Sequence, residues 1–156
     1  MRGRYGMGYM NSSAIIGIAG LVAGALDLTA SATLFTLKGG SLEKTLQFVA
    51  SGALGARSLE GGKKTAVAGL GFHFFIALCV ATVYYFLRSR IPLIVADPVM
   101  TGILYGLGVH LIMSLVVVPL SAAPRRPFSI VFFLTQAVIH MFLVGLPIAL
   151  IVRLLS

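Results

Sequence analysis

The sequence predicts an all-α integral membrane protein, a bundle of four transmembrane helices. Of its 156 residues, 58% are hydrophobic and only 10% are charged, whereas a soluble domain has about a quarter of its residues charged. Four apolar stretches are each long enough to cross about 30 Å of hydrocarbon as a helix. The segments between them are polar and contain prolines and glycines, which is typical of connections outside lipid. We therefore expect a single transmembrane domain over 1–156.

The boundaries of the four spans follow from capping residues and prolines. The first span begins after Asn11-Ser12-Ser13, which can cap a helix, and the third begins at Asp97-Pro98, where proline suits the first helical turn. The third span is expected to stop at Pro119, and Pro147 is expected to bend the fourth. These signals place the spans at 14–37, 65–87, 98–119 and 129–152.

The first connection has a pattern of its own. Leucine, valine and alanine recur at helical spacing at Leu42, Leu46, Val49 and Ala53, with polar residues between them. This pattern predicts a short helix over 41–51 that lies in the membrane interface. The glycine-rich stretch 52–62 would then return the chain to the second span. A flexible loop is the alternative interpretation.

The chain is strongly basic, with 12 Lys and Arg against 4 Asp and Glu and a net charge of +8. In so apolar a chain this charge indicates contact with anionic lipid, and we expect no binding of nucleic acid. Loops one and three contain seven cations and the opposite face contains five, so the positive-inside rule places the loops inside and both termini outside. The two sets are Lys38, Lys44, Arg57, Lys63, Lys64, Arg125 and Arg126, and Arg2, Arg4, Arg88, Arg90 and Arg153.

The N-terminus also has features of a secretory signal. Arg2 and Arg4 precede an apolar run, and Ala30-Ser31-Ala32 is similar to a cleavage site for signal peptidase. However, the apolar run continues through Leu37 and is long enough to span the membrane. We therefore expect a retained first span.

A single cysteine, Cys79, lies in the apolar run of the second span. One cysteine cannot form an internal disulfide. We expect Cys79 to be a small packing residue inside the bundle rather than a reactive thiol.

Each span carries one ionisable residue in its interior: Asp27, His73, His110 and His140. Counted from the face shared by loops one and three, their depths are about 12 to 17 Å, near the middle of the membrane. An aspartate at that depth costs about 2.5–3.5 kcal/mol, so Asp27 is expected to face the protein interior and pair with a histidine. Polar side chains one turn away would orient these groups from a second layer of contacts. They are Ser31, Ser114 and Gln136.

Small residues form stripes that include three of the ionisable residues. Helices in lipid contact one another through small residues, so these stripes are expected to face the bundle interior. The helix-packing glycines are expected to be Gly17, Gly20, Gly24, Gly102 and Gly106, in the rows of Asp27 and His110. Gly69, Ala77 and Ala81 form the row of His73.

Several functions suit three imidazoles and one carboxylate at a common depth. A metal ion could be held by His73, His110 and His140, a haem by two of them, or protons could pass between the groups. Alternatively, the polar residues fix the helix register, and the chain is an accessory or structural subunit that packs through its glycine-rich faces, either on itself or in a larger membrane complex. Because the histidines are buried in the spans and away from the loop serines, we expect no enzymatic activity.

Three features resemble a known family. They are GIAGLVAG in the first span, VHLIMSLVVVPLSA around His110 and Ser114, and one histidine in each of the second and fourth spans. In these features the chain resembles small bacterial inner-membrane proteins of the YagU-like type, over the first span and about the last hundred residues. The resemblance implies a four-helix protein of the bacterial inner membrane, and it implies no particular activity or cofactor. The long basic first loop and Asp27 depart from the family pattern.

Overall fold

The structure is a computed structural model that describes residues 10–91, 96–125 and 127–156. Its regular elements are all helical. Four helical rods are long and apolar enough to cross a membrane: Ser12–Leu37, Gly62–Arg88, Pro98–Leu120 and Ile130–Leu155. Helices are thereby confirmed at the positions of the four predicted spans, with boundaries that agree to within three residues. Arg2, Arg4 and Arg126, which enter the charge count, lie outside the described residues.

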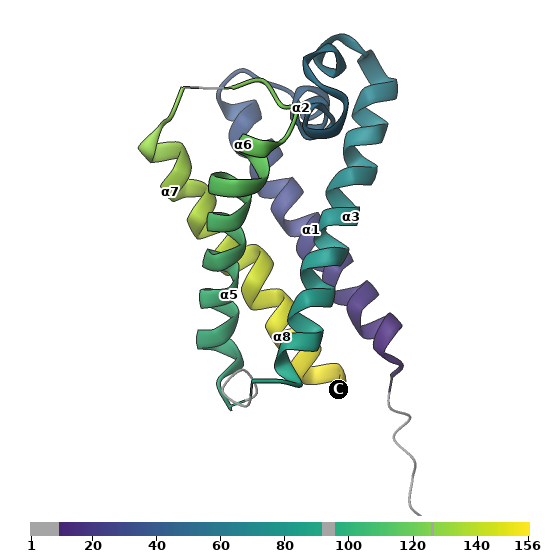
Figure 1. The fold of residues 1–156 in the computed structure, drawn as a ribbon, viewed down its shortest axis with the longest axis vertical. Coiled ribbons are helices and arrows are strands. Elements are labelled where there is room, and N and C mark those ends of the chain that lie inside the picture. Colours follow the sequence, from purple (N-terminus) through teal and green to yellow (C-terminus); the bar gives the residue numbers. More distant parts are fainter. Residues whose placement is uncertain (1–9, 92–95, 126) are drawn as a thin grey trace, which may run out of the picture.

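Two of the rods are single helices and two are interrupted. The single helices are α1 (Ser12–Leu37) and α3 (Gly62–Arg88). The third rod consists of α5 (Pro98–Ile112), the π-helical turn η2 (Met113–Val117) and α6 (Val118–Leu120). The fourth consists of α7 (Ile130–Ile139), the π-helical turn η3 (His140–Gly145) and α8 (Leu146–Leu155). Figure 1 shows the rods as one bundle, with α2 at one end.

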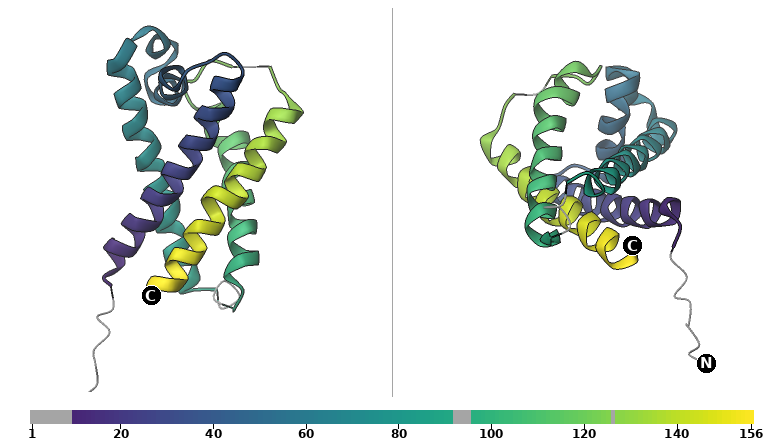
Figure 2. Two further views of the ribbon diagram at one scale, coloured as in Figure 1. Left: turned by 180° about the vertical axis from the view of Figure 1, so that it is seen from behind. Right: turned by 60° about the horizontal axis from the view of Figure 1, so that its bottom comes forward.

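The rods pack as two layers that cross at an angle. Figure 2 shows α1 beside the continuous rod formed by α7, η3 and α8, and both are inclined to α3 and α5. In agreement, α1 contacts α3 and α8, and α5 contacts η3 and α8. The start of α1 and the C-terminus lie at the end of the bundle opposite α2 (Figure 1). The polar segment between α6 and α7 lies at the α2 end.

The core between α1, α3 and α8 is built from small and branched side chains, which lets the helix backbones approach closely. Gly20 and Gly24 on α1 face α3 so tightly that an added Cβ would lie 2.9 Å from Leu78 Cδ2 and 3.0 Å from Phe74. The buried core residues are Ile15, Ala19, Ala23, Ala81, Tyr84, Val144, Ile148, Ala149 and Val152.

Both predicted caps are formed. The Asn11 side chain accepts a hydrogen bond from the Ala14 N–H at 2.8 Å, which fixes the start of α1. Asp97 Oδ1 accepts from the N–H groups of Val99 and Met100, at 3.0 and 2.9 Å, and Pro98 occupies the first turn of α5. These side chains satisfy N–H groups that have no partner within the helix.

A helix also forms in the first connection, as predicted, and it is slightly longer than expected. This helix, α2 (Leu42–Leu54), ends at Gly55, whose φ of 76° favours glycine. Its buried Gln47 Nε2 donates to the Gly62 carbonyl at 3.1 Å, which ties α2 to the start of α3. The 3-10 turn η1 (Ala56–Glu60) carries Ser58, whose buried hydroxyl donates to the Gln47 carbonyl at 3.2 Å. These bonds make α2 a packed element rather than a flexible loop.

Each interrupted rod has its π-helical turn close to a proline. η2 ends at Val117, two residues before Pro119, and η3 ends at Gly145, two residues before Pro147. Proline has no N–H, and its ring clashes with the carbonyl four residues earlier, so a wider turn before it relieves the clash. The third rod ends at Leu120, one residue after the predicted stop at Pro119. Pro147 likewise follows a π-helical turn, whereas the bend that the sequence predicts there stays a prediction.

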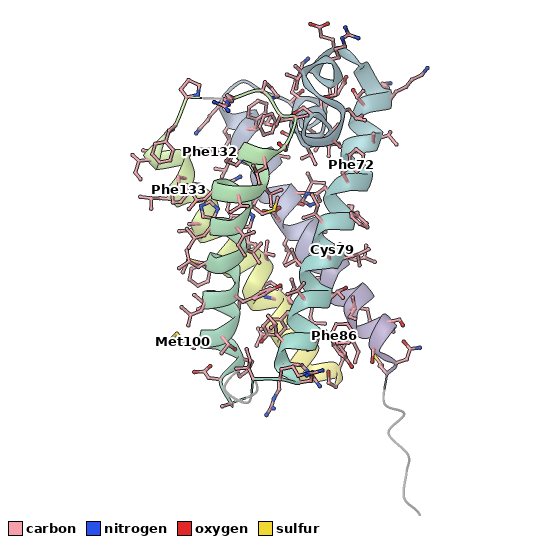
Figure 3. The ribbon with its side chains drawn as sticks, viewed as in Figure 1. Phe72, Cys79, Phe86, Met100, Phe132 and Phe133 are labelled. Carbon is pink, nitrogen blue, oxygen red and sulfur yellow. The ribbon has the colours of Figure 1, made fainter. Side chains whose placement is uncertain are left out.

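The outer surface of the bundle is apolar. Cys79 is exposed near the middle of α3 (Figure 3), so the prediction that it packs inside the bundle is wrong. Large hydrophobic side chains are exposed along all four rods, for example Leu21 (52%), Val67 (69%), Leu104 (57%) and Val131 (67%). Soluble monomers rarely expose apolar surface on this scale. The apolar character of the second span therefore did not distinguish the inside of the bundle from its outside.

Candidate functional site

Asp27 on α1 and His73 on α3 form the first pair of ionisable residues. His73 Nε2 lies 2.8 Å from the Gly24 carbonyl oxygen and 4.0 Å from Asp27 Oδ2. A carbonyl can only accept, so Nε2 carries the proton that is donated to Gly24. The side chains are 13% exposed for His73 and 17% for Asp27. Asp27 Oδ1 is buried and has no hydrogen-bond partner in the described part of the chain.

The glycines of α1 bring this pair together. A Cβ on Gly24 would lie 3.0 Å from the Phe74 ring and 3.1 Å from Ala77 Cβ, so α3 passes directly over this part of α1. Only this close approach lets the imidazole of His73 reach a backbone carbonyl of the neighbouring helix. Protonation of the second ring nitrogen would place an imidazolium beside the Asp27 carboxylate, which would form an ion pair.

His110 on α5 and His140 on η3 form the second pair. Their ring centroids are 5.3 Å apart, and the ring planes are inclined at 55°. His140 Nδ1 lies 2.8 Å from the Gln136 carbonyl oxygen, so Nδ1 carries the proton and Nε2 has a free lone pair in the neutral ring. His110 Nδ1 lies 3.4 Å from Ser114 Oγ. His110 is only 2% exposed, and its Nε2 has no hydrogen-bond partner among the described residues.

The surroundings of the second pair combine an aromatic wall with unused polar atoms. Phe133 on α7 contacts the His110 ring edge-on, with centroids 4.5 Å apart. Gln136, one turn before His140, has a buried Oε1 without a partner in the part of the chain that the structure describes. A buried polar atom without a partner costs about 1–3 kcal/mol, so each of these atoms requires an explanation.

The structure does not bring the four predicted residues into one cluster. Within residues 10–91, 96–125 and 127–156, no group of three or more His, Cys, Asp or Glu side chains lies close enough to hold a metal ion. A single site on His73, His110 and His140 is therefore not formed. The reason is the order of helix neighbours: α3 packs on α1, whereas α5 packs on η3 and α8. The polar residues form two pairs instead, Asp27 with His73 and His110 with His140.

The predicted supporting residues differ in what they contact. The Ser114 hydroxyl contacts His110, whereas Gln136 contacts His140 through its backbone carbonyl and not through its side chain. Among the described residues, no polar contact joins Ser31 to Asp27. Gly102 and Gly106 face the fourth rod, where added Cβ atoms would lie 2.7 Å from Ala149 Cβ and 2.7 Å from Met141 Cα, respectively. Gly17 is different, because a Cβ there would meet nothing within 4 Å.

A tyrosine pair links α3 to α5 and was not predicted. Tyr105 donates its hydroxyl hydrogen to the Val80 carbonyl at 2.6 Å, and its ring lies 5.0 Å from that of Tyr84. Each tyrosine occurs in an apolar span with no charged residue beside it in sequence. The sequence position of the tyrosines therefore did not indicate that they contact each other. The contact joins the helix of the first pair to the helix of the second.

The comparisons give no family for this chain. No protein-family model, curated protein or solved structure matches it. The resemblance to YagU-like proteins therefore remains a prediction. The fold and the site define a class: an all-helical bundle of four membrane-length helices with two pairs of ionisable side chains that are buried or partly buried.

Proposed function

We propose that this chain is a multi-pass integral membrane protein, located in the bacterial inner membrane as the resemblance implies. The apolar outer surface and four membrane-length helices support this. In this arrangement α2 lies at the interface, where Lys38, Lys44, Lys63 and Lys64 are exposed. Such a basic surface suits anionic lipid headgroups. The loops carrying these lysines would face the cytoplasm under the positive-inside rule.

For its activity, we propose that the protein is a small, non-enzymatic cation transporter that takes up protons at Asp27 and His73. One observation carries this proposal: a carboxylate with an unpartnered buried oxygen lies 4.0 Å from an imidazole of the neighbouring helix. Ionisable residues inside membrane spans are costly, and they mark ion pathways and proton relays. A haem is less well supported, because histidine rings 5.3 Å apart leave no space for a flat macrocycle between them.

The test is proton movement in vesicles of phosphatidylethanolamine and phosphatidylglycerol that contain the purified chain and a pH-sensitive dye. Internal pH is recorded after a membrane potential or an inward gradient of a transition-metal ion is imposed. We expect the protein to accelerate the pH change and Asp27→Asn to abolish this acceleration. Asp97→Asn is the matched control, since asparagine also caps a helix and Asp97 lies at a helix end. Vesicles with protein that respond no faster than empty vesicles would refute the proposal.

A second candidate is a structural role as a homo-oligomer or as a subunit of a larger membrane complex. Gly17 and Gly71 favour it, because among the described residues no atom lies within 4 Å of either added Cβ, and both therefore allow another helix to approach. Cross-linking in native membranes tests this role. A specific cross-linked species that Gly17→Leu eliminates would support it, whereas only monomer in the membrane would count against it.

A further inference from the structure

We propose that His110 and His140 form a binding site for a divalent transition-metal ion of the Zn²⁺ type, with Nε2 of each ring as a ligand. The inference rests on the proposed function, since it names a second cation for the same transporter. It assigns separate tasks to the two pairs: Asp27 and His73 hold a proton, whereas His110 and His140 hold a metal ion.

The hydrogen bonds of the two rings leave the right atoms free. A histidine that binds metal characteristically donates its other N–H to a carbonyl or another acceptor. His140 does so through Nδ1 to the Gln136 carbonyl at 2.8 Å, and Ser114 Oγ lies 3.4 Å from Nδ1 of His110. Nε2 of His140 then presents a lone pair, and Nε2 of His110 does so in the tautomer in which Nδ1 donates to Ser114 Oγ. Nε2 of His110 is buried without a described partner, as expected of a ligand atom before it binds.

The separation of the rings matches one shared ion. Zn²⁺ binds imidazole nitrogen at about 2.0–2.1 Å, so two imidazoles on one tetrahedral ion have ring centres roughly 5 Å apart. On opposite sides of an ion, their centres would be roughly 6 Å apart with the same bond lengths. The observed centroid distance is 5.3 Å. The rings therefore already have the spacing of two neighbouring ligands in a tetrahedral site.

We assign the third ligand position to Gln136 of α7. Gln136 lies one turn before His140, and its Oε1 is buried without a partner in the described chain. An amide oxygen completes a set of two strong ligands and one weak ligand, and the fourth position is open to water. Such a site holds an ion less tightly than a closed structural site, and an ion that is to be transported must also be able to leave.

The backbone supports the placement of both histidines. His140 is the first residue of η3, and η2 begins three residues after His110. π-helical turns are rare and frequently occur at functional sites. Gly106, one turn before His110, packs against the backbone at Met141, and this contact brings α5 and η3 together beside the two rings. Two prolines and one glycine thus shape the segment that carries the site.

The test is binding of Co²⁺ and Zn²⁺ alone to the purified full chain in detergent, with Cys79→Ser as the background because the exposed thiol is a competing ligand. Co²⁺ reports a tetrahedral site through its visible spectrum, and calorimetry gives the stoichiometry. We expect one ion per chain, and at least a tenfold loss of affinity in His110→Ala and in His140→Ala. His73→Ala is the matched control, because His73 belongs to the other pair, and it should bind normally.

Misfolding is excluded by a variant that should gain affinity. Gln136→Glu replaces a weak ligand by a carboxylate, and we expect it to bind Zn²⁺ more tightly than the parent chain. The metal-site proposal is overturned by the absence of stoichiometric binding, or by equal losses in His73→Ala and His110→Ala. Proton movement without metal binding would remove this inference and leave the proposed function standing. Metal binding without ion movement in vesicles would support the metal site and refute the proposed transport function.

Discussion

Gly106 on α5 packs directly on the backbone of His140, so a Cβ at Gly106 would collide with the His140 carbonyl oxygen and lie 2.7 Å from Met141 Cα. The same fourth rod contributes Gly145, whose added Cβ would lie 2.6 Å from Gly106 Cα. Two helices of large apolar side chains could not approach this closely. The contact therefore fixes the distance between the helices that carry His110 and His140.

The first prediction concerns this contact. Gly106→Ala must push α5 away from η3, and overpacking of this kind costs about 1–3 kcal/mol. We expect a lower midpoint of thermal unfolding in detergent. Gly108→Ala is the control, because a Cβ at Gly108 would meet nothing within 4 Å. Equal unfolding midpoints for the two variants would show that α5 and η3 do not meet as described.

The second prediction concerns the contact of α2 with α3. A Cβ on Gly69 would collide with the Leu46 carbonyl group and lie 3.2 Å from the Ala50 nitrogen. Gly69→Ala should therefore displace α2 and increase hydrogen exchange in 42–54, whereas Gly71→Ala, where the space is open, should not. If exchange in α2 is equally fast in the parent chain and in both variants, α2 is not held against α3.

Much of the fold could be predicted because membrane spans are marked by length and composition. Asn11 and Asp97 identified two helix starts, and the polar segments between spans separated the helices. The choice of neighbours could not be predicted. A stripe such as Gly20 and Gly24 shows which face of a helix packs, but it does not show which helix that face meets. The sequence therefore indicated four buried ionisable residues but not their division into two pairs.

The sequence also could not predict which side chains point into the bundle and which point outward. In a soluble protein an apolar residue usually indicates the inside, but here the outer surface is apolar as well, so Cys79 gave no information on its direction. The prolines were informative only in part. Pro119 and Pro147 indicated disturbed helices, whereas the wider turns that precede them depend on how the rods pack.

The third prediction uses Cys79 as a reporter of the lipid-facing surface. Because Cys79 is exposed near the middle of a membrane-length helix, it should lie in hydrocarbon when the protein is in a bilayer. We expect a water-soluble maleimide to leave Cys79 unmodified in intact membranes and to label it fully after denaturation in SDS, as measured by mass spectrometry.

An engineered cysteine at Ala56, an exposed residue in the connection between α2 and α3, is the positive control. Rapid labelling of Cys79 in intact membranes would contradict the proposed membrane position of α3.

The fourth prediction concerns the end of the bundle opposite α2. Arg88 Nη1 donates to the Val152 carbonyl at 3.0 Å, and the guanidinium carbon lies 5.2 Å from the centroid of the Tyr85 ring. This bond ties the end of α3 to α8, the last element of the fourth rod. Arg88→Met retains much of the side-chain length but removes the donors, and a hydrogen bond to a charged group contributes about 1.5–3 kcal/mol when it is well shielded. Arg88 is only half-buried, so we expect the free energy of unfolding to fall by an amount near or below the lower end of that range.

Arg90→Met is the control, because Arg90 is exposed two residues later. The measurement is unfolding in detergent together with hydrogen exchange at 150–156, and faster exchange there in Arg88→Met alone is the expected result. If both variants exchange like the parent chain, the C-terminal turn is held by apolar packing, and the Arg88 bond contributes nothing measurable.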